Sequence, residues 1–285
     1  MSLSLCMIVR DEENRIEKTI QSVAGVIDEI VIIDTGSKDG TKEKARSLGA
    51  KTFDFQWVDD FSAARNYSIE KAETEWILIL DADEYLETDP GVVRAAISDQ
   101  SVDAYSLIWD HPNWDIKPFY QLRKTRLFRN KGIRFEGRAH EDLFGTLNPN
   151  KWKSIGAKII HEDKGVDPQK VDLYLSLLEK DVPQTPNLSR HHYNLGVHYY
   201  QKGKQSLSEQ HFRKSMSVPD RPFYSILSTI HLFEWALNRD RDEAKDLFNA
   251  AGELLKNHHD HIEVKFHPQL KPYWEGMKNR LERSP

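Results

Sequence analysis

The sequence is poor in several features that point to particular classes of protein. It holds one cysteine, Cys6, which excludes an internal disulfide framework and a cysteine zinc cluster. Its apolar stretches are only as long as strands, so we expect neither a signal peptide nor a membrane-spanning segment. The formal charge is −5, so the chain lacks the excess of positive charge that would indicate nucleic acid as a partner. We expect a cytoplasmic protein, and peripheral attachment to the inner face of the membrane stays open.

Glycine-rich phosphate loops are missing as well. Residues 34–41 lack the glycine spacing of a Rossmann fingerprint or a Walker loop. The start of the chain has no glycine- and lysine-rich loop of the kind that nucleotidyltransferases use. The chain does have 285 residues, 39% of them hydrophobic, which is enough for one large or two medium domains with a substantial core.

Several short apolar runs predict buried strands that end in polar residues. Residues 3–9, 30–33 and 75–80 have the composition of strands in a parallel sheet. The second run ends at Asp34, and the third ends in Asp81, Ala82, Asp83 and Glu84. Because ligands of open α/β sheets bind at the carboxyl ends of strands, we expect these acidic groups to meet at one edge.

The acidic groups suggest a metal ion and a nucleotide. Because alternate residues of a strand point the same way, Asp81 and Asp83 can converge on one hard divalent ion, Mn²⁺ or Mg²⁺, which would hold a diphosphate. A solvated acidic turn is the alternative. Asp34 and Asp39 are suited to accept hydrogen bonds from a base or a ribose. Asp39 or Thr41 could also cap a helix that extends to residue 48.

Four motifs in register resemble family 2 glycosyltransferases of the GT-A fold. They are CMIVRDEE at 6–13, IIDTGSKDGT at 32–41, WVDDFSAARN at 57–66 and ILILDADE at 77–84. The third motif is similar to a bacterial subgroup with lipopolysaccharide-core glucosyltransferases and the peptide S-glycosyltransferases of bacteriocins. The resemblance covers residues 1–165 and implies an α/β catalytic domain with a mostly parallel, Rossmann-like sheet.

The resemblance also implies a reaction and a donor site. The donor would be a nucleoside diphosphate sugar, usually of uridine, and the transfer would be inverting. Asp83, helped by Asp81, would bind the metal ion, and a late histidine, His161 after a strand at 157–160, would be a further ligand. A core or loop role is the alternative for His161. The residues expected at the nucleotide sugar are Val9, Arg10, Glu12, Asp34, Asp39, Arg65 and Asp81.

The acceptor chemistry is expected between the acidic motif and residue 165, where strands are predicted at 102–111 and 120–129, the second dense in cations. Inverting transfer needs a carboxylate base, and the subgroup carries a similar His-Glu at Glu141. Asp142 and Glu136 are the other candidates, and Glu141 could instead pair with Arg138 or another surface cation. We expect Arg65 to contact the diphosphate or hold the acidic loop, with a solvent ion pair as its alternative.

After residue 165 nearly all of the sequence has a helical pattern, so we place a second domain at 166–285. It is similar to tetratricopeptide (TPR) repeats, although a plain helical bundle is the alternative. Two repeats are fewer than independent stability requires, so we expect docking on the catalytic domain, and a protein partner or self-association stays open. We expect His191, His192, His258 and His259 to be solvated. The positions that match the repeat are Leu195, Gly196, Tyr199, Phe212, Ser215 and Pro219, then Trp235, Ala244, Phe248 and Ala251.

Two other functions are compatible with these patterns. A nucleotidyltransferase could use the same strand-end aspartates, and an inactive binding scaffold could rest on the helical repeats. The acidic motifs favour an active, metal-dependent glycosyltransferase. Its acceptor, whether a glycan, a lipid-linked glycan or a peptide, is not indicated by the sequence.

Overall fold

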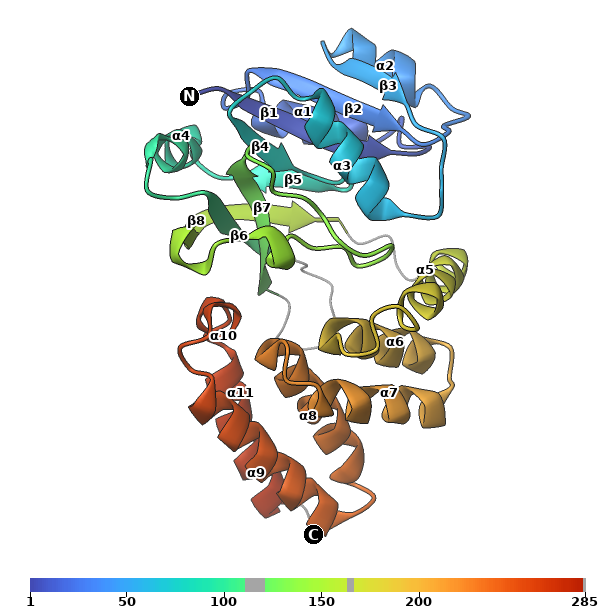
Figure 1. Cartoon of the computed structure of the whole chain (residues 1–285), viewed down its shortest axis with the longest axis vertical. Helices are drawn as coiled ribbons and strands as arrows, with labels where there is room; N and C mark the ends of the chain where they lie inside the picture. Colours follow the sequence, from blue (N-terminus) through green and yellow to red (C-terminus); the bar gives the residue numbers. More distant parts are fainter. Residues whose placement is uncertain (111–120, 163–166, 284–285) are drawn as a thin grey trace. The chain divides into compact units, whose positions relative to one another are not determined.

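The structure, a computed structural model, describes residues 1–110, 121–162 and 167–283 (Figure 1). The chain divides into two compact units, Met1–Gly165 and Val166–Pro285. The first contains a sheet, and the described residues of the second form helices (Figure 1). His111 and Tyr120, which bounded predicted strands, lie outside the described residues. None of the described helices is long and apolar enough to cross a membrane.

The first unit is built on an eight-stranded sheet with the order β3-β2-β1-β4-β7-β6-β8-β5. The strands from β3 to β4 are parallel, and so are β6 and β8. Strand β7 runs antiparallel to both of its neighbours, and β5 runs antiparallel to β8. The predicted α/β class with a mostly parallel sheet is therefore confirmed. The strands are β1 (Leu3–Val9), β2 (Glu29–Asp34), β3 (Lys51–Asp54), β4 (Trp76–Ile79), β5 (Glu84–Glu87), β6 (Ala104–Asp110), β7 (Gln121–Arg129) and β8 (Trp152–His161).

Helices α1 and α3 pack on opposite faces of the parallel strands. Leu5 of β1 belongs to the same buried core as Ile16 and Ile20 of α1. The next residue of β1, Cys6, points to the other face, where its Sγ lies 3.5 Å from the carbonyl oxygen of Ser68 in α3. Cys6 is fully buried, as expected, and burial raises the pKa of its thiol. The helical segments of this unit are α1 (Ile16–Val23), α2 (Thr41–Ser47), α3 (Phe61–Lys71), α4 (Pro90–Ser98), η1 (Phe144–Thr146) and η2 (Pro149–Lys151).

The predicted strands are all present, and the differences lie at the edges of the sheet. Strand β8 is longer than predicted and includes His161 as its last residue. Strands β3 and β5 were not predicted, because they are four-residue edge strands with charged residues and no apolar run. Helix α4 was also missed. It begins where Asp89 accepts a hydrogen bond from Gly91 N and Pro90 fixes the first helical residue.

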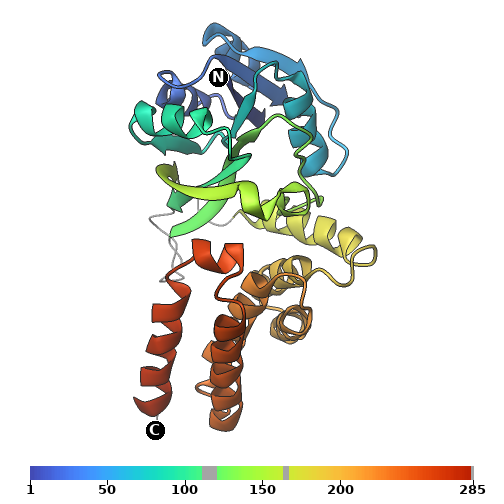
Figure 2. The same cartoon turned by 60° about the vertical axis from the view of Figure 1, so that its left-hand side comes forward.

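In the second unit, the helices from α5 to α9 pack on one another in sequence order, and α11 packs on α9 (Figure 2). A Cβ atom on Gly196 would lie 2.6 Å from the Phe212 ring, so glycine lets α6 and α7 approach closely. Farther along the chain, the Phe248 ring of α9 stacks on the Trp274 ring of α11 with centroids 5.1 Å apart. The predicted TPR-like helical region is confirmed. Its helices are α5 (Pro168–Asp181), α6 (Ser189–Gln201), α7 (Gln205–Ser217), α8 (Pro222–Ala236), α9 (Arg241–Asn257), α10 (Ile262–Phe266) and α11 (Leu270–Arg283).

The prediction that His191 and His192 are solvated is wrong. Their exposed fractions are 2% and 5%, because α6 is packed against α5, α7 and α8. His191 Nδ1 lies 2.8 Å from Thr185 Oγ1, and His192 Nε2 lies 3.0 Å from the Pro186 carbonyl oxygen. These contacts make burial of the polar rings tolerable. His259 is exposed and His258 half-buried.

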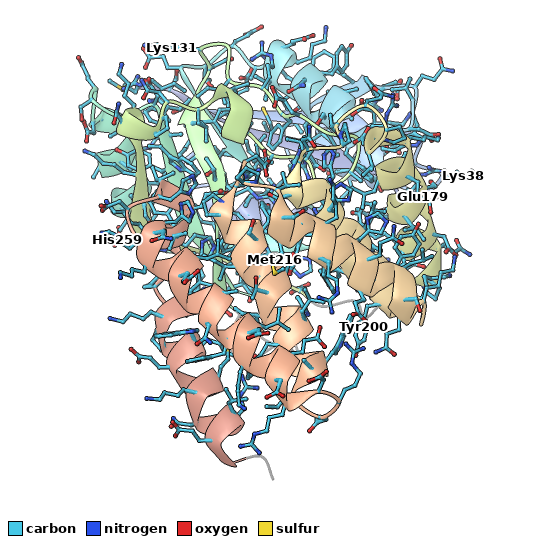
Figure 3. All side chains as sticks on the ribbon, turned by 60° about the horizontal axis from the view of Figure 1, so that its bottom comes forward. Lys38, Lys131, Glu179, Tyr200, Met216 and His259 are labelled. Atoms are coloured by element: carbon cyan, nitrogen blue, oxygen red, sulfur yellow. The ribbon has the colours of Figure 1, made fainter. Side chains whose placement is uncertain are left out.

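One aromatic residue of this unit remains well exposed. Tyr200, near the end of α6, is 57% exposed (Figure 3), and its ring centroid lies 5.5 Å from that of Trp235 in α8. The expected protein partner or self-association stays a prediction, as does docking of this unit on the first.

Candidate active site

Asp34 ends β2 beside the end of β1, with which it pairs in register at Val9. Its side chain is buried, and Oδ1 accepts hydrogen bonds from Gly36 N at 3.0 Å and Ser37 N at 2.9 Å. Gly36 has a φ of 109°, a conformation that favours glycine. The other oxygen, Asp34 Oδ2, is buried without a hydrogen bond from any residue that the structure describes. A ligand N–H or O–H would remove the cost of that unmet hydrogen bond.

The loops after β1 and β2 are joined by hydrogen bonds. Glu12 N donates to Thr41 Oγ1 at 2.8 Å, and Glu13 N donates to Asp39 Oδ2 at 3.2 Å. Asp39 Oδ1 accepts from Thr41 N at 3.0 Å, at the start of α2. The hydrogen bond from the Thr41 side chain lowers the pKa of Asp39. Both oxygens of Asp39 therefore organise the loops and the start of the helix.

The three residues expected at the β1 edge lie in different surroundings. The carbonyl oxygen of Val9 accepts hydrogen bonds from both N and Oγ1 of Thr35, at 3.0 Å each. Arg10 is exposed. Glu12 Oε2 lies 3.1 Å from Nη1 of Arg15. Val9 and Glu12 thus help to hold the loop that borders Asp34.

The acidic motif is a turn and not the end of a strand. Strand β4 ends at Ile79 and β5 begins at Glu84, so Asp81 and Asp83 do not project from one extended segment, as the sequence had suggested. Asp83 Oδ2 lies 3.7 Å from His161 Nε2 at the end of β8. Asp81 instead faces two arginines. The two carboxylates consequently contact different groups.

Arg65 and Arg126 hold the side chain of Asp81. Arg65 Nη2 donates to Oδ1 at 2.7 Å, and Arg126 Nη2 donates to Oδ2 at 3.1 Å. Burial alone would raise the pKa of Asp81, but the two guanidinium groups hold it below its usual range. Asp81 is therefore ionised at neutral pH, and both of its oxygens are already engaged.

Arg65 also binds the predicted base. Its Nε lies 2.5 Å from Glu141 Oε1, and the Arg65 side chain is 6% exposed. Burial opposes the charge of Arg65, but Asp81 and Glu141 raise its pKa above the ordinary value. Glu141 is thus paired with a buried cation instead of a surface one, and Arg65 holds the acidic turn as one of its expected roles.

Hydrogen bonds to α3 fix the loop that carries Glu141. Asn66 Nδ2 donates to the carbonyl oxygen of Phe135 at 3.0 Å, and Phe135 N donates to Asn66 Oδ1 at 2.8 Å. Nearby, Ser62 Oγ donates to the carbonyl oxygen of Gly137 at 2.6 Å. The loop then closes with backbone hydrogen bonds between the other two candidate bases, Glu136 and Asp142.

Three site residues escaped the sequence analysis, Trp109, Lys124 and Arg126, and Glu84 was expected only as one of the acidic groups at the sheet edge. Glu84 is buried, and its Oε1 accepts hydrogen bonds from Trp109 Nε1 at 2.7 Å and Arg126 Nη2 at 3.0 Å. Its Oε2 accepts from Asp81 N at 3.0 Å. The sequence feature that could have indicated Lys124 and Arg126 was the cation-dense strand 120–129, because residues two apart in a strand lie on the same face.

The donors fit a divalent ion that is bound largely by its substrate. Within the described ranges, no cluster of three histidine, cysteine, aspartate or glutamate side chains could hold a metal ion alone. Asp83 and His161 supply one carboxylate and one imidazole near each other. Magnesium-type ions are commonly held by one or two carboxylates together with water and substrate phosphates, so the residues present fit an ion that takes its other ligands from water and phosphate.

The sequence profile of glycosyl transferase family 2 matches residues 4–154, which is more than half of the chain. The chain belongs to this family. The match confirms the resemblance inferred from the motifs.

Individual proteins are similar to parts of the chain. A TPR repeat-containing protein of Synechococcus elongatus is 40% identical over 141 residues, 49% of this chain and 34% of that protein. An uncharacterized glycosyltransferase of Rickettsia bellii is 30% identical over 166 residues, 55% of this chain and 56% of that protein. The chain thus matches less than two thirds of the length of these relatives. The crystal structure of a mycobacterial protein shares the fold, with a TM-score of 0.50 and 14% identity over 64% of this chain and 73% of that one.

Proposed function

We propose that this family 2 protein is a metal-dependent glycosyltransferase that moves a sugar from a nucleoside diphosphate sugar, a UDP-sugar, to a hydroxyl or thiol acceptor. The observation that carries this proposal is the arrangement at one edge of the sheet. There, Asp34 has a buried oxygen without a hydrogen bond from the described residues, and Arg65 forms ion pairs with both Asp81 and Glu141. The acceptor would be a glycan, a lipid-linked glycan or a peptide.

The nucleoside would bind over the loops that follow β1 and β2. Asp34 Oδ2 would accept a hydrogen bond from the base or ribose. This oxygen is buried and receives no hydrogen bond from the described residues, so the nucleoside would supply the missing donor. Val9, Arg10 and Glu12 would border the nucleoside. Asp39 would act through the loops, since both of its oxygens are bonded there.

Asp83 and His161 would hold Mn²⁺ or Mg²⁺. When bound, such an ion neutralises charge on the diphosphate as it leaves. Asp81 would support this group indirectly, because Arg65 and Arg126 occupy its oxygens and keep it ionised. Glu84, which accepts from Arg126, fixes the orientation of that guanidinium.

Glu141 would act as the general base of an inverting transfer. Arg65 binds Glu141 Oε1, and Oε2 makes no hydrogen bond with the residues that the structure describes. Oε2 would take the proton of the acceptor as its oxygen or sulfur bonds to the anomeric carbon. The bond from that carbon to the diphosphate oxygen breaks, and nucleoside diphosphate leaves from the opposite face.

A thermal-shift screen of nucleoside diphosphate sugars with and without Mn²⁺, followed by donor hydrolysis assays, tests the proposal. We expect a metal-dependent shift with UDP-sugars and slow release of UDP. A protein that binds donors but releases no diphosphate would be the scaffold alternative. Release of pyrophosphate from a nucleoside triphosphate and a sugar phosphate would instead indicate a nucleotidyltransferase.

A further inference from the structure

Lys124 places an ammonium group near the acidic turn without a carboxylate of its own. It lies in β7, on the same face as Arg126 two residues later. Its Nζ is 3.5 Å from the centre of the Trp109 ring. Among the residues that the structure describes, Nζ has neither a hydrogen bond nor an ion pair.

The nearby carboxylates are already paired with other cations. Asp81 binds both arginines, Glu84 binds Arg126, and Glu141 binds Arg65. Burial and the neighbouring charge of Arg126 lower the pKa of Lys124 to about 8, although the three carboxylates partly offset this effect. Lys124 is therefore a half-buried cation with no carboxylate in direct contact among the described residues, and a ligand anion would supply such a contact.

The position of β7 indicates which part of a substrate this cation would meet. In the sheet, β7 follows β4, on the side away from β1 and β2. Asp34 lies at the end of β2, and the acidic turn follows β4. A donor whose nucleoside contacts Asp34 and whose diphosphate contacts the turn would direct its sugar end toward β7.

We propose that Lys124 binds an anionic oxygen of the donor, either on the phosphate next to the sugar or on a carboxylate of an acidic sugar. This inference rests on the proposed function and adds a residue that determines donor specificity. Trp109 would hold the ammonium group of Lys124 in place by its ring contact, and Glu84 would fix Trp109 through the indole N–H.

Calorimetric titration of wild type and Lys124→Met shows whether the anionic oxygen belongs to the phosphate or to a carboxylate of the sugar. Methionine keeps an unbranched apolar stem against Trp109 but removes the charge. Lys124→Gln is a second variant, in case the first does not fold. Lys153→Met is the matched control, because Lys153 is a 55% exposed strand lysine that pairs with Asp99 at 3.1 Å. The ligands are uridine, UDP, inorganic pyrophosphate, UDP-glucose and UDP-glucuronic acid, each with Mn²⁺ and at constant ionic strength.

A phosphate contact predicts that UDP and pyrophosphate bind about 10- to 100-fold more weakly to Lys124→Met, the loss of one charge-assisted hydrogen bond, while uridine is unaffected. A sugar carboxylate contact predicts unchanged UDP binding and a wild-type preference for UDP-glucuronic acid over UDP-glucose that the variant loses. If neither change occurs although wild type binds UDP, the role of Lys124 is refuted and the proposed function stands. A wild-type protein that binds neither UDP nor pyrophosphate overturns both.

Discussion

Replacing Arg65 with methionine tests the buried ion network at the acidic turn. Arg65 lies between Asp81 and Glu141, with nitrogen–oxygen distances of 2.7 and 2.5 Å and a side chain that is 6% exposed. Removing one partner of a buried ion pair leaves an uncompensated charge and costs about 3–5 kcal/mol. Glu141 loses its ion pair in this variant, whereas Asp81 keeps Arg126 at 3.1 Å, so we expect the free energy of unfolding to fall by an amount near the lower end of that range, about 3 kcal/mol.

The loss should depend on pH in a defined direction. In wild type the pKa of Asp81 is lowered, so its contribution to stability is complete above the unfolded pKa, about 3.9, and falls as pH drops below it. Without Arg65, only Arg126 offsets the effect of burial on Asp81, so the pKa of Asp81 rises. Protonation of Asp81 then removes part of the uncompensated charge, and the variant loses less stability as pH falls. The difference in unfolding free energy should therefore be largest near pH 7 and shrink toward pH 4.

Urea unfolding of wild type and variant at pH 7, 5.5 and 4.5, followed by circular dichroism, measures this difference. Arg46→Met is the control, because Arg46 is 52% exposed and pairs with Glu43 at 3.4 Å. We expect it to cost about 0–1 kcal/mol. The reasoning would be refuted if Arg65→Met lowered the free energy of unfolding by no more than the control does, or if the decrease became larger as the pH falls.

Three further predictions concern the metal, the nucleoside and the helical unit. Asp83→Ala should abolish donor hydrolysis while the far-ultraviolet circular dichroism stays unchanged, and wild-type turnover in Mn²⁺ would exclude Asp83 as a ligand. Asp34→Ala should weaken donor binding by about 0.5–3 kcal/mol with little change in rate at saturating donor, because its hydrogen bonds act equally in ground and transition states. A rate that saturating donor does not restore would give Asp34 another role. Gly196→Ala should destabilise the protein by about 1–3 kcal/mol, since the new Cβ would lie 2.6 Å from Phe212, and thermal unfolding equal to wild type would show that α6 and α7 can separate at no cost.

Local patterns were enough to predict the buried strands of the parallel part of the sheet and the acidic residue that ends β2. The apolar runs at 3–9, 30–33 and 75–80 became β1, β2 and β4, and Asp34 came to the edge as expected. Strand alternation failed for Asp81 and Asp83, because the chain leaves β4 after Ile79 and enters β5 at Glu84. That change depends on the pairing of β5 with β8, which no local pattern contains.

The partners of the acidic turn could not be predicted, because they come from distant parts of the chain. Arg126 reaches Asp81 because β7 pairs with β4, and Trp109 reaches Glu84 from β6. Sequence order does not specify this strand order. The same limit explains His192, which looked polar and solvated until α6 proved to pack against three other helices.

The most direct test of the account is the hydrolysis of a UDP-sugar by Glu141→Gln, with water as the acceptor, measured beside the affinity for the donor. Glutamine keeps the shape of the side chain but cannot accept the proton. We predict a rate about 10²–10⁴-fold below wild type and a donor affinity within a few-fold of it. Glu136→Gln and Asp142→Asn, which alter the neighbouring candidates, should retain more activity. A loss of donor affinity in Glu141→Gln, or a rate equal to wild type, would contradict the assignment of Glu141 as the base.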